Sequence, residues 1–129
     1  MYTGNLSLIY GTAWKKERTK ELVIQSVKAG FRGIDTACQP KHYHEAGVGE
    51  ALASLAQEGF KREDIFLQTK FTPLSGQDPL NVPYTQNADL STQVAQSFVV
   101  SKQNLQTNYV DSLVLHSPLS SFEDLETVW

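Results

Sequence analysis

Short apolar runs alternate along the chain with longer segments in which apolar positions recur every three or four residues. The short runs, whose length is typical of strands, occupy residues 6–10, 31–34, 65–69 and 110–115. The longer segments, whose spacing is typical of helices, occupy residues 16–29, 45–57 and about 89–105. Strands separated by helices predict a parallel sheet with right-handed crossovers. The pattern therefore indicates an α/β fold.

Each predicted helix has an apolar face and residues that suit its ends. The faces comprise Leu22, Val23, Val27 and Ala29 in the first helix, Val48, Leu52 and Leu55 in the second, and Val94, Phe98 and Leu105 in the third. The expected caps are Gly30 and Gly59 at C-terminal ends, Asp89 or Ser91 before the third helix, and Ser120 or Ser121 before a fourth that begins shortly before Trp129.

One segment fits neither pattern. Residues 71–88 contain Pro73, Pro79 and Pro83 together with Gly76, which predicts a loop. This loop is longer than most structural connections, and loops of that length often carry function.

Composition narrows the class of protein. The chain has 129 residues, of which 40% are hydrophobic and 19% charged, which is typical of one globular domain. Its net charge of -3 argues against a nucleic-acid partner. No apolar run approaches the roughly 20 residues that span a bilayer, and the N-terminus does not resemble a signal peptide, so no membrane role is expected. The single cysteine, Cys38, cannot form an internal disulfide, which favours the cytoplasm.

Polar residues follow three of the predicted strands. Asp35, Lys70 and His116 each stand at a strand end, and the C-terminal ends of neighbouring parallel strands lie about 4.8 Å apart. An Asp–Lys ion pair with a flanking histidine is therefore expected on the face where α/β barrels place their active sites. The alternative is that charged residues end strands simply because loops begin there.

Several blocks of the sequence resemble those of the aldo-keto reductases. In the family's order, they are GTAW (residues 11–14), GIDTA (33–37), YHE (43–45), VGEAL (48–52), FLQTK (66–70) and YVDSLVLHSP (109–118). The combination of the Asp-Thr-Ala block with a strand that ends in His-x-Pro is specific, and the blocks span nearly the whole chain. Relative to the family, residues 38–42 look like an insertion ahead of Tyr43.

The resemblance implies a partial TIM (β/α)8 barrel of about the first four βα units, because a complete barrel needs about 250 residues. Residues 1–129 would form the N-terminal part of an aldo-keto reductase (NADP-dependent oxidoreductase) domain. The implied function is NADPH-dependent reduction of an aldehyde or ketone to an alcohol, with a small carbonyl compound as substrate and no metal. Half a barrel by itself is expected to bind NADPH weakly or not at all and to turn over poorly.

The resemblance also implies residue roles. The catalytic set is Asp35, Tyr43, Lys70 and His116, with Tyr43 as general acid. An ammonium beside a phenol favours the phenolate, which suits that assignment. The cofactor-binding residues would be Gly11, Thr12, Ala13 and Asp35, and the substrate-binding residues Trp14, Tyr43 and His116. Competing interpretations make Tyr43 a surface loop residue and Trp14 part of the loop packing.

Two other functions stay open at this point. A truncated, inactive half-barrel could act as an interaction or assembly module and self-associate through its open sheet edges. An unrelated α/β-barrel enzyme could use Asp35 and His116 as an acid–base pair.

Three further motifs are interpreted as structural. Gly47-Val48-Gly49 lacks the third glycine and the preceding strand of a dinucleotide fingerprint. Cys38, His42 and His44 match no zinc spacing and are interpreted as solvated loop residues. Residues 61–64 are expected to form a solvated turn.

Overall fold

A single four-stranded parallel sheet organises the chain, of which the computed structural model describes residues 1–128. The strands pair in chain order and are β1 (Ile9–Gly11), β2 (Gly33–Asp35), β3 (Phe66–Phe71) and β4 (Ser112–Leu115). The α-helices are α1 (Thr19–Lys28), α2 (Glu45–Gln57), α3 (Leu90–Leu105) and α4 (Phe122–Val128). Short 3-10 turns are η1 (Lys16–Arg18), η2 (Arg62–Asp64) and η3 (Leu74–Gly76). The predicted parallel α/β order is confirmed.

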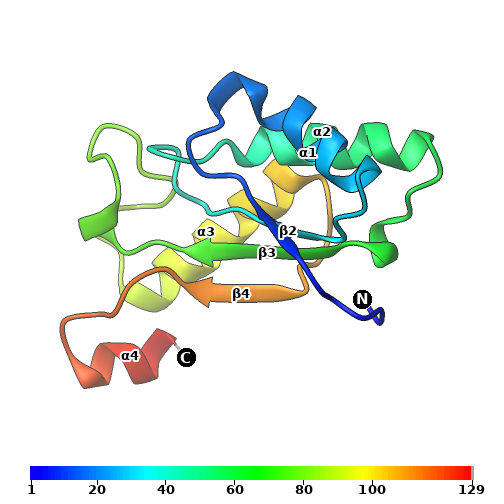
Figure 1. Cartoon of the computed structure of the whole chain (residues 1–129). Helices are drawn as coiled ribbons and strands as arrows, with labels where there is room; N and C mark the ends of the chain where they lie inside the picture. The colour runs from blue at the N-terminus through cyan, green and yellow to red at the C-terminus, as the bar shows by residue number, and fades with distance from the viewer. Residues whose placement is uncertain (129) are drawn as a thin grey trace.

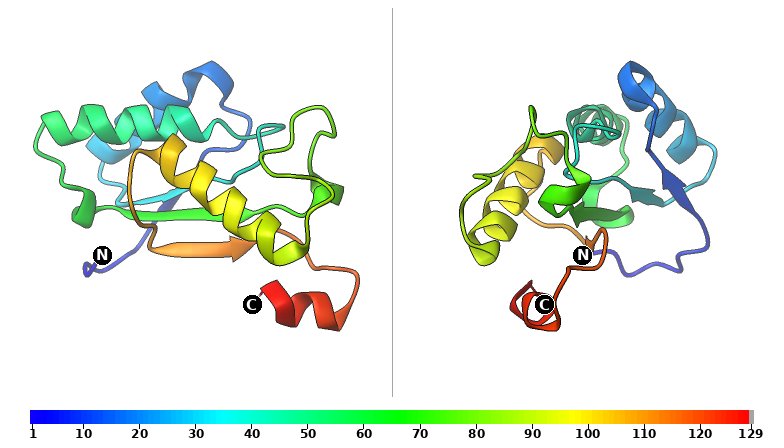
Figure 2. Two further views of the ribbon diagram at one scale, coloured as in Figure 1. Left: turned by 180° about the vertical axis from the view of Figure 1, so that it is seen from behind. Right: turned by 90° about the vertical axis from the view of Figure 1, so that its left-hand side faces the viewer.

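The helices are distributed unequally around the sheet. Helices α1, α2 and α3 cover one face of the sheet, and the short helix α4 contacts α3 (Figures 1 and 2). None of the helices described within residues 1–128 is long and apolar enough to cross a bilayer. The last expected helix is present from Phe122, with the Asp124 N–H donating to the Ser121 hydroxyl at 3.0 Å. Trp129 lies outside the described residues.

Element boundaries differ from the prediction mainly at the strands. Strand β1 starts three residues later than predicted and includes Gly11, because among the described residues it pairs with the three-residue β2 alone, in the register Ile9 to Gly33. Strand β3 runs on to Phe71, so Lys70 lies within the strand rather than after it. Helix α2 has the predicted bounds, and the positive φ of Gly59, 95°, ends it as expected.

The hydrophobic core lies between the sheet, helices α1 and α2, and the end of α3. It consists of Val23, Val27, Ile34, Val48, Ala51, Leu52, Leu55, Ile65, Leu67 and Leu105. The apolar face predicted for α2 is therefore confirmed. In the first helix Val23 and Val27 are buried as predicted, but Ala29 is exposed because the helix has already ended at Lys28.

Helix α3 buries a polar face instead of the predicted apolar one. Gln93, Ser97 and Ser101 are buried with Leu105, whereas Val94 and Phe98 are only half-buried. The small serines allow α3 to approach α2, where a Cβ on Gly49 would overlap the carbonyl oxygen of Asn104. Gly49 is thus required by helix packing, in line with the rejection of a dinucleotide fingerprint.

Asp111 connects four segments at the N-terminal edge of the sheet. Its carboxylate accepts hydrogen bonds from the Tyr2 N–H at 2.8 Å and the Leu67 N–H at 3.0 Å, and pairs with Arg62 at 3.2 Å. Arg62 also lies 4.1 Å from the centroid of the Tyr109 ring. The prediction of a solvated turn at residues 61–64 is therefore wrong for Arg62, because its guanidinium is largely buried against the Asp111 carboxylate.

Replacing Asp111 with Asn is expected to lower the free energy of unfolding by about 2 kcal/mol at neutral pH. Burial by itself raises the pKa of Asp111, but the N–H donors and Arg62 outweigh it, so this pKa lies below its usual range. The carboxylate therefore stabilises the fold above the unfolded-state pKa of about 3.9 and loses that effect as pH falls through the lower folded-state value.

Urea unfolding at pH 7 and at pH 3 tests this prediction. The difference between wild type and Asp111→Asn should be large at pH 7 and should shrink at pH 3. Asp64→Asn, at an exposed position on η2, is the control. It should leave the free energy of unfolding unchanged at both pH values. An equal loss of stability at both pH values would contradict the role given to the Asp111 charge.

Candidate active site

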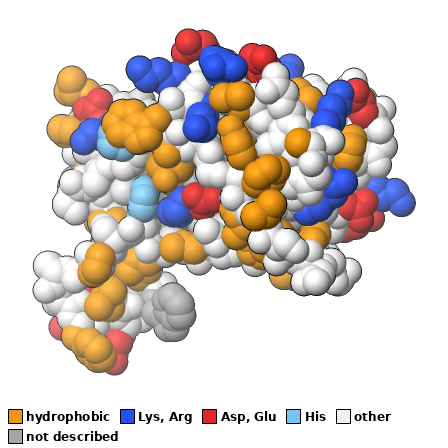
Figure 3. Space-filling view, viewed as in Figure 1, with side chains coloured by type: hydrophobic (Ala, Val, Ile, Leu, Met, Phe, Trp, Pro, Cys, Tyr) orange, Lys and Arg blue, Asp and Glu red, His pale blue; other side chains and the backbone are white. Residues whose placement is uncertain are grey.

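The three polar residues at strand ends come together at one edge of the sheet. The Lys70 ammonium lies 2.7 Å from an Asp35 carboxylate oxygen, which confirms the expected ion pair. His116 follows β4. Its backbone N–H donates to the carbonyl of Phe71 at 2.9 Å, which holds the residue beside the end of β3. Histidine, basic and acidic side chains adjoin one another on the face of the molecule seen in Figure 3.

Hydrogen bonds fix the Asp35–Lys70 pair in position. The second Asp35 oxygen accepts from the Gln68 amide at 2.9 Å, and the ammonium also donates to the Thr36 carbonyl at 2.9 Å. The Lys70 and Asp35 side chains retain 11% and 21% of their accessible surface, so bulk water screens the pair only partly. Both charges are thereby held in fixed positions at the floor of the site.

Tyr43 reaches this pair from the segment that precedes α2. Its hydroxyl lies 3.5 Å from the Lys70 ammonium, a long hydrogen bond of the kind that catalytic groups often show without substrate. Its ring meets the His116 ring edge-on, with 5.8 Å between centroids. Tyr43 is a half-buried loop residue, and these two contacts connect it to Lys70 and His116.

The His116 ring is also held by Thr72, a residue that the sequence did not predict to belong to the site. Its Nδ1 lies 2.7 Å from the hydroxyl oxygen of Thr72, just after β3. Burial, and next the charge of Lys70, hold the pKa of His116 below its usual value, which keeps the imidazole neutral at neutral pH. Within residues 1–128, no hydrogen bond joins His116 to Asp35, so the alternative of an Asp35–His116 acid–base pair gains no support from a direct contact.

The residues expected to hold the cofactor lie next to Asp35. Gly11 ends β1 opposite Asp35 and is exposed, and a Cβ built there would meet no atom within 4 Å. Thr12 is buried, and its hydroxyl donates to the Asp35 carbonyl at 2.8 Å, so its role is to join the two strand ends. Ala13 is half-buried beside them.

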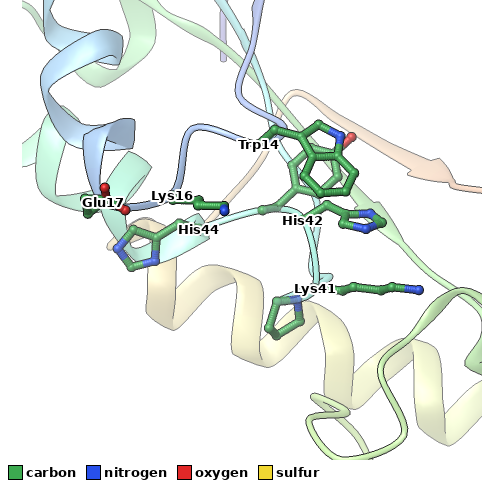
Figure 4. A pocket seen from close by; sticks show the side chains of 8 residues that line it. Trp14, Lys16, Glu17, Lys41, His42 and His44 are labelled. Atoms are coloured by element: carbon green, nitrogen blue, oxygen red, sulfur yellow. The ribbon is translucent and has the colours of Figure 1, made fainter.

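A cavity of about 390 Å³ adjoins Tyr43 (Figure 4). Its lining residues are Trp14, Lys16, Glu17, Pro40, Lys41, His42, Tyr43 and His44. Trp14 is 65% exposed and stacks on His42 with 3.9 Å between ring centroids. With this exposure Trp14 is not buried in a loop core; its ring packs on His42, lines the cavity and remains open to solvent.

Glu45 was not identified as a site residue, although it is buried directly after the site segment. Its carboxylate accepts hydrogen bonds from the hydroxyls of Thr69, at 2.6 Å, and Ser101, at 2.7 Å. The Asn104 amide donates to its other oxygen at 3.3 Å. Glu45 thus ties the start of α2 to β3 and α3, which fixes the segment that carries Tyr43.

Cys38 differs from the sequence-based expectation. It is buried rather than solvated, and its thiol donates to the carbonyl of Ser97 at 3.5 Å. Burial, followed by the negative charge of Glu45, raises the pKa of Cys38 to about 12, so the thiol is not a nucleophile at neutral pH. Within residues 1–128, no three His, Cys, Asp or Glu side chains lie close enough together to hold a metal ion.

Comparison with known proteins places this geometry in a family. The model of the aldo/keto reductase family matches residues 3–129. NADP-dependent D-sorbitol-6-phosphate dehydrogenase of Malus domestica is 31% identical over 81% of the chain, and prostaglandin F synthase 1 of Bos taurus is 34% identical over 86%. The chain spans 29% and 31%, respectively, of the lengths of these two relatives.

Solved structures give the same result. An aldo/keto reductase from Brucella melitensis matches 94% of the chain and 41% of its own length, with 30% identity and a TM-score of 0.67. The aldose reductase of Schistosoma japonicum matches 85% of the chain and 32% of its own length, with 26% identity and a TM-score of 0.67. The four βα units are therefore part of a TIM barrel, as expected. The chain belongs to the aldo/keto reductase family.

Proposed function

We propose that the chain carries the acid–base residues of an NADPH-dependent reductase that converts an aldehyde or ketone to an alcohol. The observation that supports this best is the Lys70 ammonium, which contacts both the Asp35 carboxylate and the Tyr43 hydroxyl. Residues 1–129 would correspond to the N-terminal part of the oxidoreductase domain. Their family match over 3–129 and their partial coverage of longer relatives support that assignment.

In this proposal Tyr43 gives its proton to the carbonyl oxygen of the substrate. The Lys70 ammonium stabilises the negative charge that the departing proton leaves on the phenol oxygen, and Asp35 keeps Lys70 in place. His116 is neutral and packs edge-on against the Tyr43 ring, so it can donate a hydrogen bond to the same carbonyl oxygen and orient it. Trp14 would form the wall against which the substrate packs.

The residues at the end of β1 fit one end of the cofactor. Gly11 leaves open space above the backbone, so a planar nicotinamide ring can approach closely. The Asp35 carboxylate is partly accessible for a ribose hydroxyl, and Thr12 and Ala13 would shape the adjoining floor. NADPH, when bound, would supply the hydride.

The test is NADPH oxidation by the full chain with a panel of small aldehydes and ketones. Because half a barrel is expected to bind NADPH weakly, the expected result is slow oxidation at high NADPH concentration that depends on the carbonyl compound. Tyr43→Phe, which lacks only the hydroxyl, should abolish it. A folded wild-type chain that does not oxidise NADPH even at high NADPH concentration would contradict the proposal. The cytoplasm is the proposed location, in keeping with a single, buried cysteine.

A second candidate function is assembly through the sheet edges. Within the described sheet, β1 and β4 each pair with one strand only, and both edges expose large apolar residues. Leu8 is 61% exposed, Ile9 44% and Leu113 43%. Edges of this kind pair readily with another chain, so the proposed outcome is self-association of the chain.

Sedimentation at increasing protein concentration tests the assembly candidate. A rise in average mass is expected for wild type, and Ile9→Lys and Leu113→Lys should each suppress it. Glu63→Lys, on exposed η2, is the control for added positive charge. A chain that stays monomeric at all concentrations would exclude assembly and leave the reductase proposal untouched.

A further inference from the structure

The cavity beside Tyr43 concentrates positive charge on a chain whose net charge is -3. It is lined by two lysines, Lys16 and Lys41, and by His42 and His44, with Glu17 as its one acidic residue. The ion pairs within residues 1–128 involve neither Lys16 nor Lys41. Two ammonium groups without carboxylate partners at one cavity favour an anionic ligand.

The cavity wall is held in an unusual backbone conformation. Trp14 and Lys16 have φ values of 63° and 52°, in the left-handed region that residues other than glycine rarely adopt. Strained backbone of this kind tends to occur at ligand sites. The Trp14 N–H donates to the His42 carbonyl at 2.8 Å, which joins the two cavity-lining segments. Figure 4 shows Lys16 and Lys41 on these two different segments.

We propose that this cavity binds a phosphate or carboxylate group of the substrate, with Lys16 and Lys41 as its cationic partners. This inference rests on the reductase function proposed above and names its substrate class, aldehydes and ketones that carry an anionic group. Tyr43 lines the cavity and also contacts Lys70, so one small molecule can place its anionic group in the cavity and its carbonyl at the Tyr43 hydroxyl. The volume of about 390 Å³ suits a ligand of that size.

Binding of non-reducible analogues tests the site without any turnover. Glycerol 3-phosphate, glycerate and glycerol are titrated into the full ¹⁵N-labelled chain, and amide shifts are followed by NMR. The two anions should shift amides in segments 14–17 and 40–44, and glycerol should not. The anion that binds more tightly identifies the recognised group as phosphate or carboxylate.

Lysine variants complete the test. Lys16→Gln and Lys41→Gln should each weaken anion binding about two- to fivefold, as expected for one partly exposed charge, and the exposed Lys61→Gln should not. Equal binding by all three variants, or shifts elsewhere on the chain, would overturn the anion site. Equal reduction of glyceraldehyde and glyceraldehyde 3-phosphate would overturn the substrate class but leave the reductase proposal standing. Anion binding with no carbonyl reduction would instead remove the reductase proposal.

A second inference comes from an independent observation, the contact between Thr72 and His116. Thr72 is 2% exposed, and the described residues offer its hydroxyl no hydrogen-bond partner other than the His116 Nδ1, at 2.7 Å. If Nδ1 carried the proton, the hydroxyl hydrogen would be buried without an acceptor, which is costly. A hydroxyl that donates to Nδ1 satisfies both groups and leaves the imidazole proton on Nε2.

The long loop after β3 holds Thr72 in this position. The Tyr84 hydroxyl donates to the Thr72 carbonyl at 2.7 Å, and the Gln77 amide donates to it at 3.2 Å. The Tyr84 ring also packs on Phe71, with 5.5 Å between centroids. The methyl group of Thr72 faces Gly76, where a Cβ would come within 2.8 Å of it. The loop therefore fixes both the backbone and the rotamer of Thr72.

We infer that Thr72 is a positioning residue that sets the tautomer of His116, so that Nε2 carries the proton offered to the substrate carbonyl. The use of that proton rests on the proposed reductase function, but the tautomer does not. In this way the loop after β3 would act on the site through Thr72. Removing the Thr72 hydroxyl is therefore expected to disturb the tautomer and orientation of His116 rather than the fold.

NMR of the chain labelled with ¹⁵N-histidine measures the tautomer directly. The three histidines are assigned with His42→Asn and His44→Asn. In wild type, the His116 Nδ1 should have the shift of an unprotonated acceptor and Nε2 that of a protonated nitrogen. Thr72→Val should shift the tautomer toward Nδ1–H, and Thr72→Ser should restore the wild-type state.

The wild-type spectrum is decisive even if Thr72→Val fails to fold. Protonated Nδ1 in wild type would overturn the inference, as would a folded Thr72→Val variant with an unchanged tautomer. In an active enzyme, Thr72→Val should lower kcat more than it raises KM, and Thr72→Ser should recover kcat. Absence of carbonyl reduction would contradict the reductase proposal and would not alter the tautomer result.

Discussion

Replacing Lys70 with Met should lower kcat/KM for carbonyl reduction by about 10²- to 10⁴-fold, the range that one group in proton transfer typically contributes. Met is similar in length and shape but has no charge. The Tyr43 phenol oxygen then loses the cation that stabilises its developing negative charge, 3.5 Å away in the resting site. Steady-state kinetics with the best carbonyl substrate of the panel measure the effect.

A stability control separates chemistry from folding in this experiment. Of the side chains described in residues 1–128, Lys70→Met leaves the Asp35 carboxylate, 21% exposed, with the Gln68 amide as its one partner, so the single variant is also destabilised. The double variant Asp35→Asn/Lys70→Met removes the uncompensated charge and should recover most of the lost free energy of unfolding. It should recover none of the activity. A folded Lys70→Met variant with more than a tenth of wild-type activity would contradict the role of Lys70.

The meeting of Asp35 with Lys70 could be predicted because it follows from topology. Parallel neighbouring strands bring their C-terminal ends to one edge, and the periodic pattern placed both residues at such ends. The bounds of α2 were predictable for a similar reason, because its apolar spacing is regular and a glycine follows its end. Gln68 was missed, although it lies two residues before Lys70 in β3, on the same face, and that spacing could have revealed it.

Other features depend on partners that are distant in the sequence. The buried face of α3 could not be read from apolar periodicity, because it contains the polar Ser101, whose buried hydroxyl is satisfied by Glu45. Cys38 is buried because α3 covers it, a contact between residues 59 apart. Thr72 gains its role from His116, 44 positions away. In each case a polar side chain is accepted in the interior because tertiary structure supplies its partner.

Substituting Ala for Gly49 is expected to lower the free energy of unfolding by about 3 kcal/mol, at the upper end for an overpacked interior. Two effects oppose each other at this position. Ala favours a helix over Gly by about 1 kcal/mol, but its Cβ would overlap the Asn104 carbonyl oxygen and lie 2.9 Å from the Leu105 Cα. These atoms belong to the backbone of α3 and cannot rotate away, so the two helices must separate.

Urea and thermal unfolding measure the Gly49→Ala effect, and Gly11→Ala is the control because a Cβ there meets nothing within 4 Å. Gly11→Ala should leave stability nearly unchanged, whereas Gly49→Ala should lower Tm by about 10 °C. Separation of α2 from α3 also strains the contacts of Glu45 with Ser101 and Asn104. Since Glu45 fixes the segment that carries Tyr43, the Gly49→Ala variant should lose activity even at temperatures where it is folded. A Gly49→Ala variant as stable as wild type would mean that helix propensity outweighs packing at this crossing.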